Sequence, residues 1–169
     1  MGVGPTLPPR PARGKATAAA PRAILHLLSP KNVEIVRRSM EAFARGDLDT
    51  FLAAHHPDTE WRTAADEPSP ETYSGCDGIR RFAAEISEAW ADRFEDIMEF
   101  EDFIDLGDWV VVPWTARMRG RGSGIEVDVN ESYAVRVEDG LIVRVHEYRT
   151  RQEAIDAVRP PGDTPHTSR

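Results

Sequence analysis

Two glutamates near the end of the chain have the residue type and spacing for chemistry. Glu131 lies in the run 125–137 and Glu147 in the run 141–149, and both runs are rich in β-branched and aromatic residues. The segment Glu138-Asp139-Gly140 between them is typical of a β-hairpin turn. If this loop has three residues and its glycine is left-handed, Glu131 lies directly opposite Glu147.

The same register sorts the hairpin into two faces. One face is apolar until it ends in the two glutamates, because it pairs Val137 with Leu141, Val135 with Val143 and Tyr133 with Val145. The other face is amphipathic and suits solvent or a partner subunit; it pairs Arg136 with Ile142, Ala134 with Arg144, Ser132 with His146 and Asn130 with Tyr148. This clean separation favours the register.

Carboxylates directly opposite each other on paired strands have β-carbons about 4.5–5.5 Å apart. In a half-apolar pocket, repulsion and desolvation oppose ionising both, so one tends to hold a proton. The pair then supplies a general acid beside a general base, or a donor and an acceptor for a carbonyl or hydroxyl ligand. Glutamates are seldom fully buried, so the alternative is a rim position, neutralised by Arg149 or Arg62.

Aromatic side chains elsewhere in the chain are candidates for the walls of such a pocket. Aromatic walls suit a flat, ring-bearing or polyketide-like ligand, although each of these residues also fits an ordinary core. The residues that we expect to bind substrate are Trp61, Thr63, Trp90, Trp114, Tyr133 and Arg149.

The histidines do not predict a metal site. His55 and His56 are adjacent, and neighbouring residues diverge on a helix, so we expect them to cap a helix end. In the register above, His146 faces away from the glutamates and belongs to the surface or an interface. We expect no metal and no other cofactor.

Composition limits the classes of partner. The chain has 169 residues, the size of one domain, and a formal net charge of -8. Residues 1–30 hold four basic and no acidic residues, so the remainder carries -12. An acidic body repels phosphate backbones, which argues against nucleic acid. One cysteine, Cys76, excludes an internal disulfide and favours the cytoplasm. No apolar run has the length of a membrane span.

The order of predicted elements indicates three segments: an extension at 1–28 rich in proline, alanine and arginine, a domain at 29–158, and a flexible tail at 159–169. Within the domain, three helices come first. They begin at Ser29-Pro30, where Val33, Val36, Met40 and Phe43 form a stripe; at Asp47, which caps a helix through His55; and at Asp77, with Ile79, Phe82, Ile86, Trp90 and Phe94 as the stripe.

Strands and a last helix complete the domain. The pattern predicts a strand at 59–63, a loop at 64–72, a hairpin of 97–104 with 109–119, and a helix at 150–158. Pro113 lacks a backbone donor, so its strand has an edge or a bulge there. Gly120, Gly122 and Gly124 connect two strands and open no helix, so a phosphate-cradling loop is not predicted. The fold class is α+β, with a curved, mostly antiparallel sheet around three N-terminal helices.

Several of these segments resemble the SnoaL-like branch of the nuclear transport factor 2-like superfamily. The similar residues are the run 32–49, which contains Gly46-Asp47-Leu48-Asp49, then 56–61, 73–75 and 140–148. The resemblance implies a cone-shaped α+β barrel, often dimeric, with a blind pocket. Relatives include polyketide cyclases, ketosteroid isomerases, scytalone dehydratases and limonene epoxide hydrolases, and also modules without catalysis, so fold does not settle function.

The family's catalytic residues transfer only in part. By the isomerase pattern, the oxyanion tyrosine falls on Ser39 and the carboxylate base on Thr63, while the second oxyanion acid falls near Glu131. By the epoxide hydrolase pattern, one carboxylate falls on Glu147, whereas the arginine and aspartate fall within 112–115, where this chain has no charge.

Two classes of function therefore remain. One is a cofactor-independent cyclase, isomerase or dehydratase that moves protons with Glu131 and Glu147 on an apolar substrate. The other is a non-catalytic ligand-binding or dimerisation module. In either case, the outer face with Ser132, Ala134, Ile142 and Tyr148 predicts a homodimer.

Overall fold

The computed structural model describes residues 22–65 and 70–159. Most of the predicted N-terminal extension, residues 1–21, and the predicted tail from residue 160 lie outside the described residues. The elements are α1 (Arg22–Ala44), α2 (Leu48–Ala53), β1 (His55–Arg62), β2 (Thr72–Ser74), α3 (Gly75–Ala89), α4 (Phe94–Ile97), β3 (Met98–Phe100), β4 (Ile104–Leu106), β5 (Trp109–Arg119), β6 (Glu126–Glu138), β7 (Leu141–Tyr148) and α5 (Arg151–Val158).

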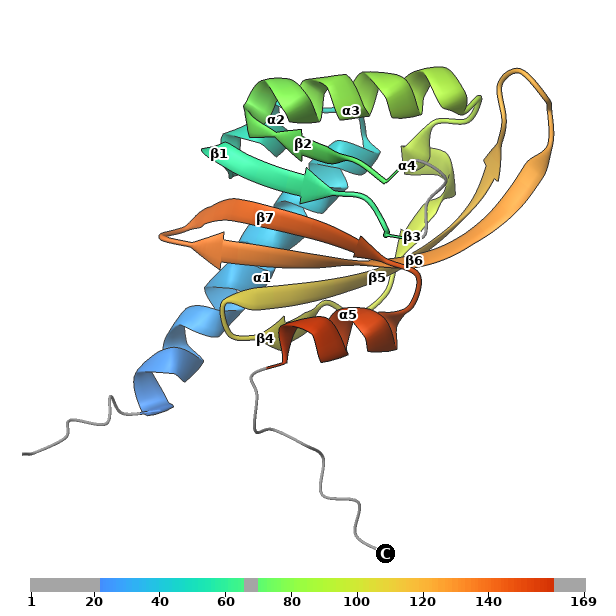
Figure 1. Cartoon of the computed structure of the whole chain (residues 1–169). Helices are drawn as coiled ribbons and strands as arrows, with labels where there is room; N and C mark the ends of the chain where they lie inside the picture. Colours follow the sequence, from blue (N-terminus) through green and yellow to red (C-terminus); the bar gives the residue numbers. More distant parts are fainter. Residues whose placement is uncertain (1–21, 66–69, 160–169) are drawn as a thin grey trace, which may run out of the picture.

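The predicted α+β class is confirmed. Seven strands form one curved, unclosed sheet with the order β2-β1-β7-β6-β5-β3, and β4 also pairs with β5. All pairs are antiparallel except β1 with β7, which are parallel. Figure 1 shows α1 and α5 on opposite faces of this sheet, and the ends of β5 and β6 projecting beyond the other strands.

The main core lies between the inner face of the sheet and the helices. The predicted stripe on α1 is confirmed, because Val36 and Met40 are fully buried and Phe43 nearly so. On α3, Ile79 and Phe82 are buried and Ile86 packs at the margin of the core. The predicted stripe is too long, because Trp90 follows the end of α3 and Phe94 begins the separate helix α4. Among the described residues, no helix combines the length and apolarity that crossing a membrane requires.

A smaller apolar cluster covers part of the outer face. Ala154 of α5 packs with Val111 and Ala134, with Tyr148 and Ile155 beside them. Thr150 caps α5, since its hydroxyl accepts a hydrogen bond from the Glu153 backbone N–H at 3.2 Å. A predicted interface residue, Ala134, is therefore already covered within the chain.

Several predicted boundaries are wrong. α1 begins at Arg22, so Ser29 lies within it and is not its cap. Ser74 precedes α3, without a capping hydrogen bond from its side chain, and Asp77 lies in the first turn of the helix, where a negative charge is favourable. β1 begins at His55 rather than at residue 59, and β2 occupies the end of the expected loop.

The predicted hairpin of residues 97–104 with 109–119 is interrupted in its first strand. Residues 97–104 divide into α4, β3 and β4, and the partner of β5 breaks between Phe100 and Ile104. Pro113 lies opposite this gap, where its carbonyl accepts a hydrogen bond from the Glu101 N–H at 2.9 Å. The prediction of an edge or bulge at this proline is confirmed, because a residue without an N–H needs no partner on that side.

The last hairpin has a different turn from the predicted one. Glu138 pairs with Leu141, and the two residues between them, Asp139 and Gly140, have φ of 50° and 82°. Two successive positive φ values are those of a type I′ turn, which matches the twist of paired strands. The register then shifts by one, because Arg136 pairs with Arg144 whereas the next residue pairs with Ile142.

The shift makes Val143 an extra residue in β7, a β-bulge. The two-residue turn reverses the predicted face of Ile142, which is fully buried in the inner core and does not lie on the outer face. Val135 pairs with Val145, not with Val143.

His55 begins β1 and still caps α2. Its Nδ1 lies 2.8 Å from the Phe51 carbonyl oxygen, and the residue is 4% exposed. Burial lowers the pKa of His55 to about 4, although the bond to Phe51 opposes this shift. The imidazole is therefore neutral in the folded protein near neutral pH.

We predict that acid destabilises the fold through His55. An unfolded histidine has a pKa of about 6.5, so the stabilisation is complete above that pH and is lost as the pH falls toward 4. Urea unfolding should show a loss of about 2 kcal/mol between about pH 7 and about pH 5, and His55→Asn should flatten this slope. A slope that His55→Asn leaves unchanged would refute the assignment.

Candidate active site

A cavity of about 330 Å³ lies between the inner face of the sheet and the helices, and we call it the inner cavity. Strands β5, β6 and β7 supply one wall, and α3 with the ends of α1 and α4 supplies the other. Its lining residues are Phe43, Thr63, Phe82, Ile86, Trp90, Phe94, Met98, Trp114, Met118, Val127, Val129, Glu131, Tyr133, Glu147 and Arg149. Most of this lining is apolar or aromatic, and the charges are confined to two glutamates and one arginine.

Glu131 is held by an arginine. Its Oε1 accepts a hydrogen bond from Arg149 Nη1 at 2.6 Å, and the residue is 8% exposed. Arg149 directly follows β7, where the register of Ser132 with Tyr148 brings it level with Glu131. The sequence left open that an arginine, Arg149 or Arg62, neutralises the glutamates at the rim of the pocket. Arg149 does form an ion pair with Glu131.

Glu147 is held by an indole. Trp61 Nε1 donates a hydrogen bond to Glu147 Oε1 at 2.7 Å, and Trp61 is fully buried. The parallel pairing of Trp61 with Val145 places the indole one inward-facing position from Glu147. Trp61 was predicted to line the pocket, but it lies behind the lining and orients a residue that does.

The sequence predicted that the two glutamates lie directly opposite each other, and this prediction is wrong. Tyr133 pairs with Glu147, and Glu131 lies one inward-facing position further along β6. Two changes cause this: the turn has two residues instead of the expected three, and the bulge adds one residue to β7, so the register beyond the bulge is displaced by two from the expected pairing. An even displacement preserves the face, so both glutamates still line the inner cavity.

Tyr133 lies between the two carboxylates on this face. Burial raises its pKa well above the usual value, and Glu147 and Glu131 raise it further. The phenol therefore keeps its proton and acts as a hydrogen-bond donor rather than as a base.

Trp114 lies opposite Glu131 on β5 and is 4% exposed. Its Nε1 has no acceptor among the described residues. A buried N–H without an acceptor costs free energy, and a ligand oxygen in the cavity would satisfy it.

The substrate-binding role of the remaining predicted residues stays a prediction, but the structure places them around one cavity. Thr63, Trp90 and Arg149 line the inner cavity together with Trp114 and Tyr133. Other lining residues were read only as core stripes or not singled out, because a wall and a core have the same apolar pattern: Phe43, Phe82, Ile86, Phe94, Met98, Met118, Val127 and Val129. His146 pairs with Ala134 on the outer face, away from the glutamates, as predicted.

Comparison with known proteins identifies the family. The model of the SnoaL-like domain matches residues 36–145, which is most of the described chain. This chain belongs to the SnoaL-like domain family. The match begins within α1 and ends within β7, so it covers most of the lining of the inner cavity, while Glu147 and Arg149 lie just beyond it.

Individual relatives support the assignment of this SnoaL-like protein. An uncharacterized protein of Mycobacterium tuberculosis (strain ATCC 25618 / H37Rv) is 28% identical over 117 residues, which are 69% of this chain and 87% of the relative. An NTF2-like protein of unknown function from Burkholderia pseudomallei K96243 superposes with a TM-score of 0.62 at 28% identity, covering 75% of this chain and 95% of that one. An NTF2-like protein from Burkholderia thailandensis E264 gives a TM-score of 0.63 at 24% identity, covering 76% and 98%.

Two residues of this SnoaL-like protein, Ser39 and Thr63, stand where the isomerase pattern has its tyrosine and its carboxylate, and they have different surroundings. Thr63 lines the inner cavity, whereas Ser39 is 1% exposed within α1 and is not part of the lining. Neither side chain ionises near neutral pH, so neither can supply the general acid or base that the isomerase pattern has at its own positions. Among the described residues, no group of histidine, cysteine and carboxylate side chains could hold a metal ion.

We predict that Glu131→Gln destabilises the protein by about 1–2 kcal/mol, because it removes the negative charge that Arg149 contacts at 2.6 Å. The figure is reduced from that of a fully buried pair, since the Arg149 side chain is 40% exposed. In urea unfolding, Arg149→Gln added to Glu131→Gln should cost less than the sum of the two single changes. Additive effects would show that the ion pair contributes little.

Proposed function

We propose that the inner cavity binds a small, apolar, ring-bearing molecule that carries a carbonyl or hydroxyl group. The observation that carries this proposal is the arrangement of the lining: aromatic and aliphatic walls that end in Glu131, Tyr133, Glu147 and Arg149. A volume of about 330 Å³ is at the lower end of the range for ligand sites, which suits one or two fused rings.

The polar end offers donors and an acceptor to such a ligand. Tyr133 keeps its proton, and the Trp114 N–H lacks an acceptor among the described residues, so either can donate to a carbonyl oxygen. Glu147 offers carboxylate oxygen, and the Trp61 hydrogen bond fixes its orientation. This set recognises an oxygen-bearing ring better than a hydrocarbon.

The chemistry that this set supports is proton transfer, as in an isomerase, cyclase or dehydratase. We propose Glu147 as the base that removes a proton next to the carbonyl, with Tyr133 or Trp114 stabilising the oxyanion. Glu131 forms an ion pair with Arg149, so the proposed role of the glutamates is unequal: Glu147 moves the proton and Glu131 positions Arg149 beside it.

A binding module without catalysis is the second candidate. It is favoured by Ser39 and Thr63, which stand where the isomerase pattern has its tyrosine and its carboxylate. The two candidates differ in proton exchange, since both bind a ligand but only an enzyme accelerates exchange at carbon.

One enolisable ketone, used as a test ligand, distinguishes the enzyme from the non-catalytic binding module. We predict that 2-tetralone binds in calorimetry, and that Glu147→Gln keeps this binding within a few-fold while losing α-proton exchange into D₂O, followed by NMR, by at least roughly 100-fold. Glu99→Gln, which removes a charge outside the inner cavity, is the matched control. Binding without accelerated exchange would select the non-catalytic candidate, and absence of binding would contradict both.

We also propose a homodimer, through the part of the outer face that α5 leaves open. Trp109, Arg136, Arg144 and His146 gather there, and the Arg136 guanidinium lies 5.9 Å from the Trp109 ring. The Nε atoms of both arginines and His146 Nε2 are buried without a hydrogen-bond partner among the described residues, and a second copy would supply acceptors. Of the residues first expected in this interface, Ile142 faces inward and Ala134 is covered.

Sedimentation equilibrium at micromolar concentration tests this proposal. We expect a dimer whose dissociation constant rises at least roughly tenfold in Arg144→Glu, because a carboxylate would then face the acceptors that the second copy offers to Arg144. A monomer at every concentration would remove the proposal.

The free cysteine Cys76 is consistent with action in a reducing compartment, and we propose the cytoplasm.

A further inference from the structure

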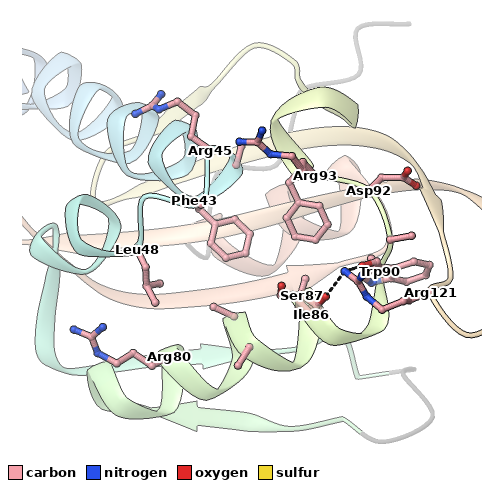
Figure 2. Close-up of a pocket in the computed structure, with 16 residues that line it drawn as sticks. Phe43, Arg45, Leu48, Arg80, Ile86, Ser87, Trp90, Asp92, Arg93 and Arg121 are labelled. Atoms are coloured by element: carbon pink, nitrogen blue, oxygen red, sulfur yellow. Dashed lines mark hydrogen bonds between the residues drawn. The ribbon is translucent and has the colours of Figure 1, made fainter.

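A second cavity of about 420 Å³ lies outside the first, between the end of α1, α2, α3 and α4, and we call it the outer cavity. Figure 2 shows the ring of Phe43 pointing into it, with Leu48 and Ile86 on neighbouring sides. Four lining side chains, Phe43, Ile86, Trp90 and Phe94, also line the inner cavity. These apolar groups separate the two spaces.

The rim of the outer cavity is basic in an otherwise acidic protein. Arg45, Arg80, Arg93 and Arg121 line it, and one acidic residue, Asp92, is the counterpart in the lining. Figure 2 places these four guanidinium groups on different sides of the space around Phe43. The chain as a whole has a net charge of -8, so this cluster of arginines has the opposite sign to the net charge of the protein.

The neighbouring acids neutralise this rim only in part. Asp92 is engaged by Arg119 at 2.9 Å, outside the lining, and Arg93 pairs with Glu95. Arg80 lies 4.0 Å from Asp49, whose side chain is 94% exposed, and so weak a contact leaves the guanidinium available. Arg45 lies close enough to Asp47 to lower the pKa of that carboxyl slightly, after the larger effect of Thr50.

Arg121 is fixed in place by uncharged groups. Its Nη2 donates to the carbonyl oxygens of Ser87 at 3.0 Å and Trp90 at 2.7 Å, at the end of α3. Backbone carbonyls orient the guanidinium without cancelling its full charge. A preorganised arginine costs less entropy to engage a ligand anion than a mobile one.

We propose that the outer cavity is a binding site for a small anionic amphiphile: a carboxylate or sulfonate attached to an aromatic ring or rings. The apolar floor takes the rings, and the arginine rim takes the anion, because a guanidinium matches a carboxylate in shape and charge. The arginine rim is not part of the inner cavity, so this proposal does not rest on the function proposed above.

Calorimetry with 2-naphthoate and its neutral analogue 2-naphthamide tests the proposal. At low ionic strength, the full chain should bind naphthoate roughly tenfold more tightly than naphthamide, and salt should reduce that preference. Arg45→Gln with Arg80→Gln should abolish the preference and leave naphthamide binding unchanged. Arg38→Gln with Arg151→Gln, which removes the same charge from exposed sites outside the lining, should keep it.

The inner cavity also contains an arginine, so Arg149→Gln distinguishes the two sites. Preference for naphthoate that survives Arg149→Gln supports the outer cavity, and preference lost there but kept in the Arg45 and Arg80 variant overturns the proposal. Equal binding of the two compounds, or no binding of naphthoate, also overturns it. Arg45→Gln alone changes one exposed side chain and provides the same comparison, with a smaller loss, if the double variant folds poorly.

Discussion

One extra residue in β7 determines the arrangement of the candidate site. The bulge at Val143 shifts the register between β6 and β7, so Tyr133 meets Glu147 and Glu131 meets Arg149. Without it, the two-residue turn would pair Glu131 with Tyr148 and Ser132 with Glu147, so the two carboxylates would lie on opposite faces of the sheet. The bulge thus keeps both carboxylates on the inner face and places Arg149 beside Glu131.

The parallel pairing of β1 with β7 completes this arrangement. It brings Trp61, fully buried, within 2.7 Å of Glu147, so a residue from the start of the domain orients one from its end. Apolar side chains around these polar groups exclude water and strengthen each hydrogen bond. The candidate site is therefore the polar end of an apolar cavity, and this arrangement fits the proposed ligand, a ring that carries one oxygen.

Local patterns in the sequence predicted what local physics decides. The buried stripe on α1, the Asp47 cap, and the break opposite Pro113 follow from periodicity, a side-chain oxygen and a missing N–H. The bulge was missed because Asp139-Gly140 suits a two-residue turn as well as part of a three-residue loop, and no nearby residue marks Val143 as extra. The Trp61 contact and the division of aromatic residues between wall and core depend on long-range pairing, which spacing along the chain does not encode.

A crystal structure grown with 2-tetralone tests the central claim most directly. The claim is that the inner cavity, with its polar end at Glu131, Tyr133, Glu147 and Arg149, is the ligand site of this SnoaL-like protein. The expected result is ring density against Trp114 and Phe82, with the ketone oxygen within hydrogen-bonding distance of Tyr133 or of the Trp114 N–H. An inner cavity filled by side chains, or ligand density only outside it, would contradict the claim.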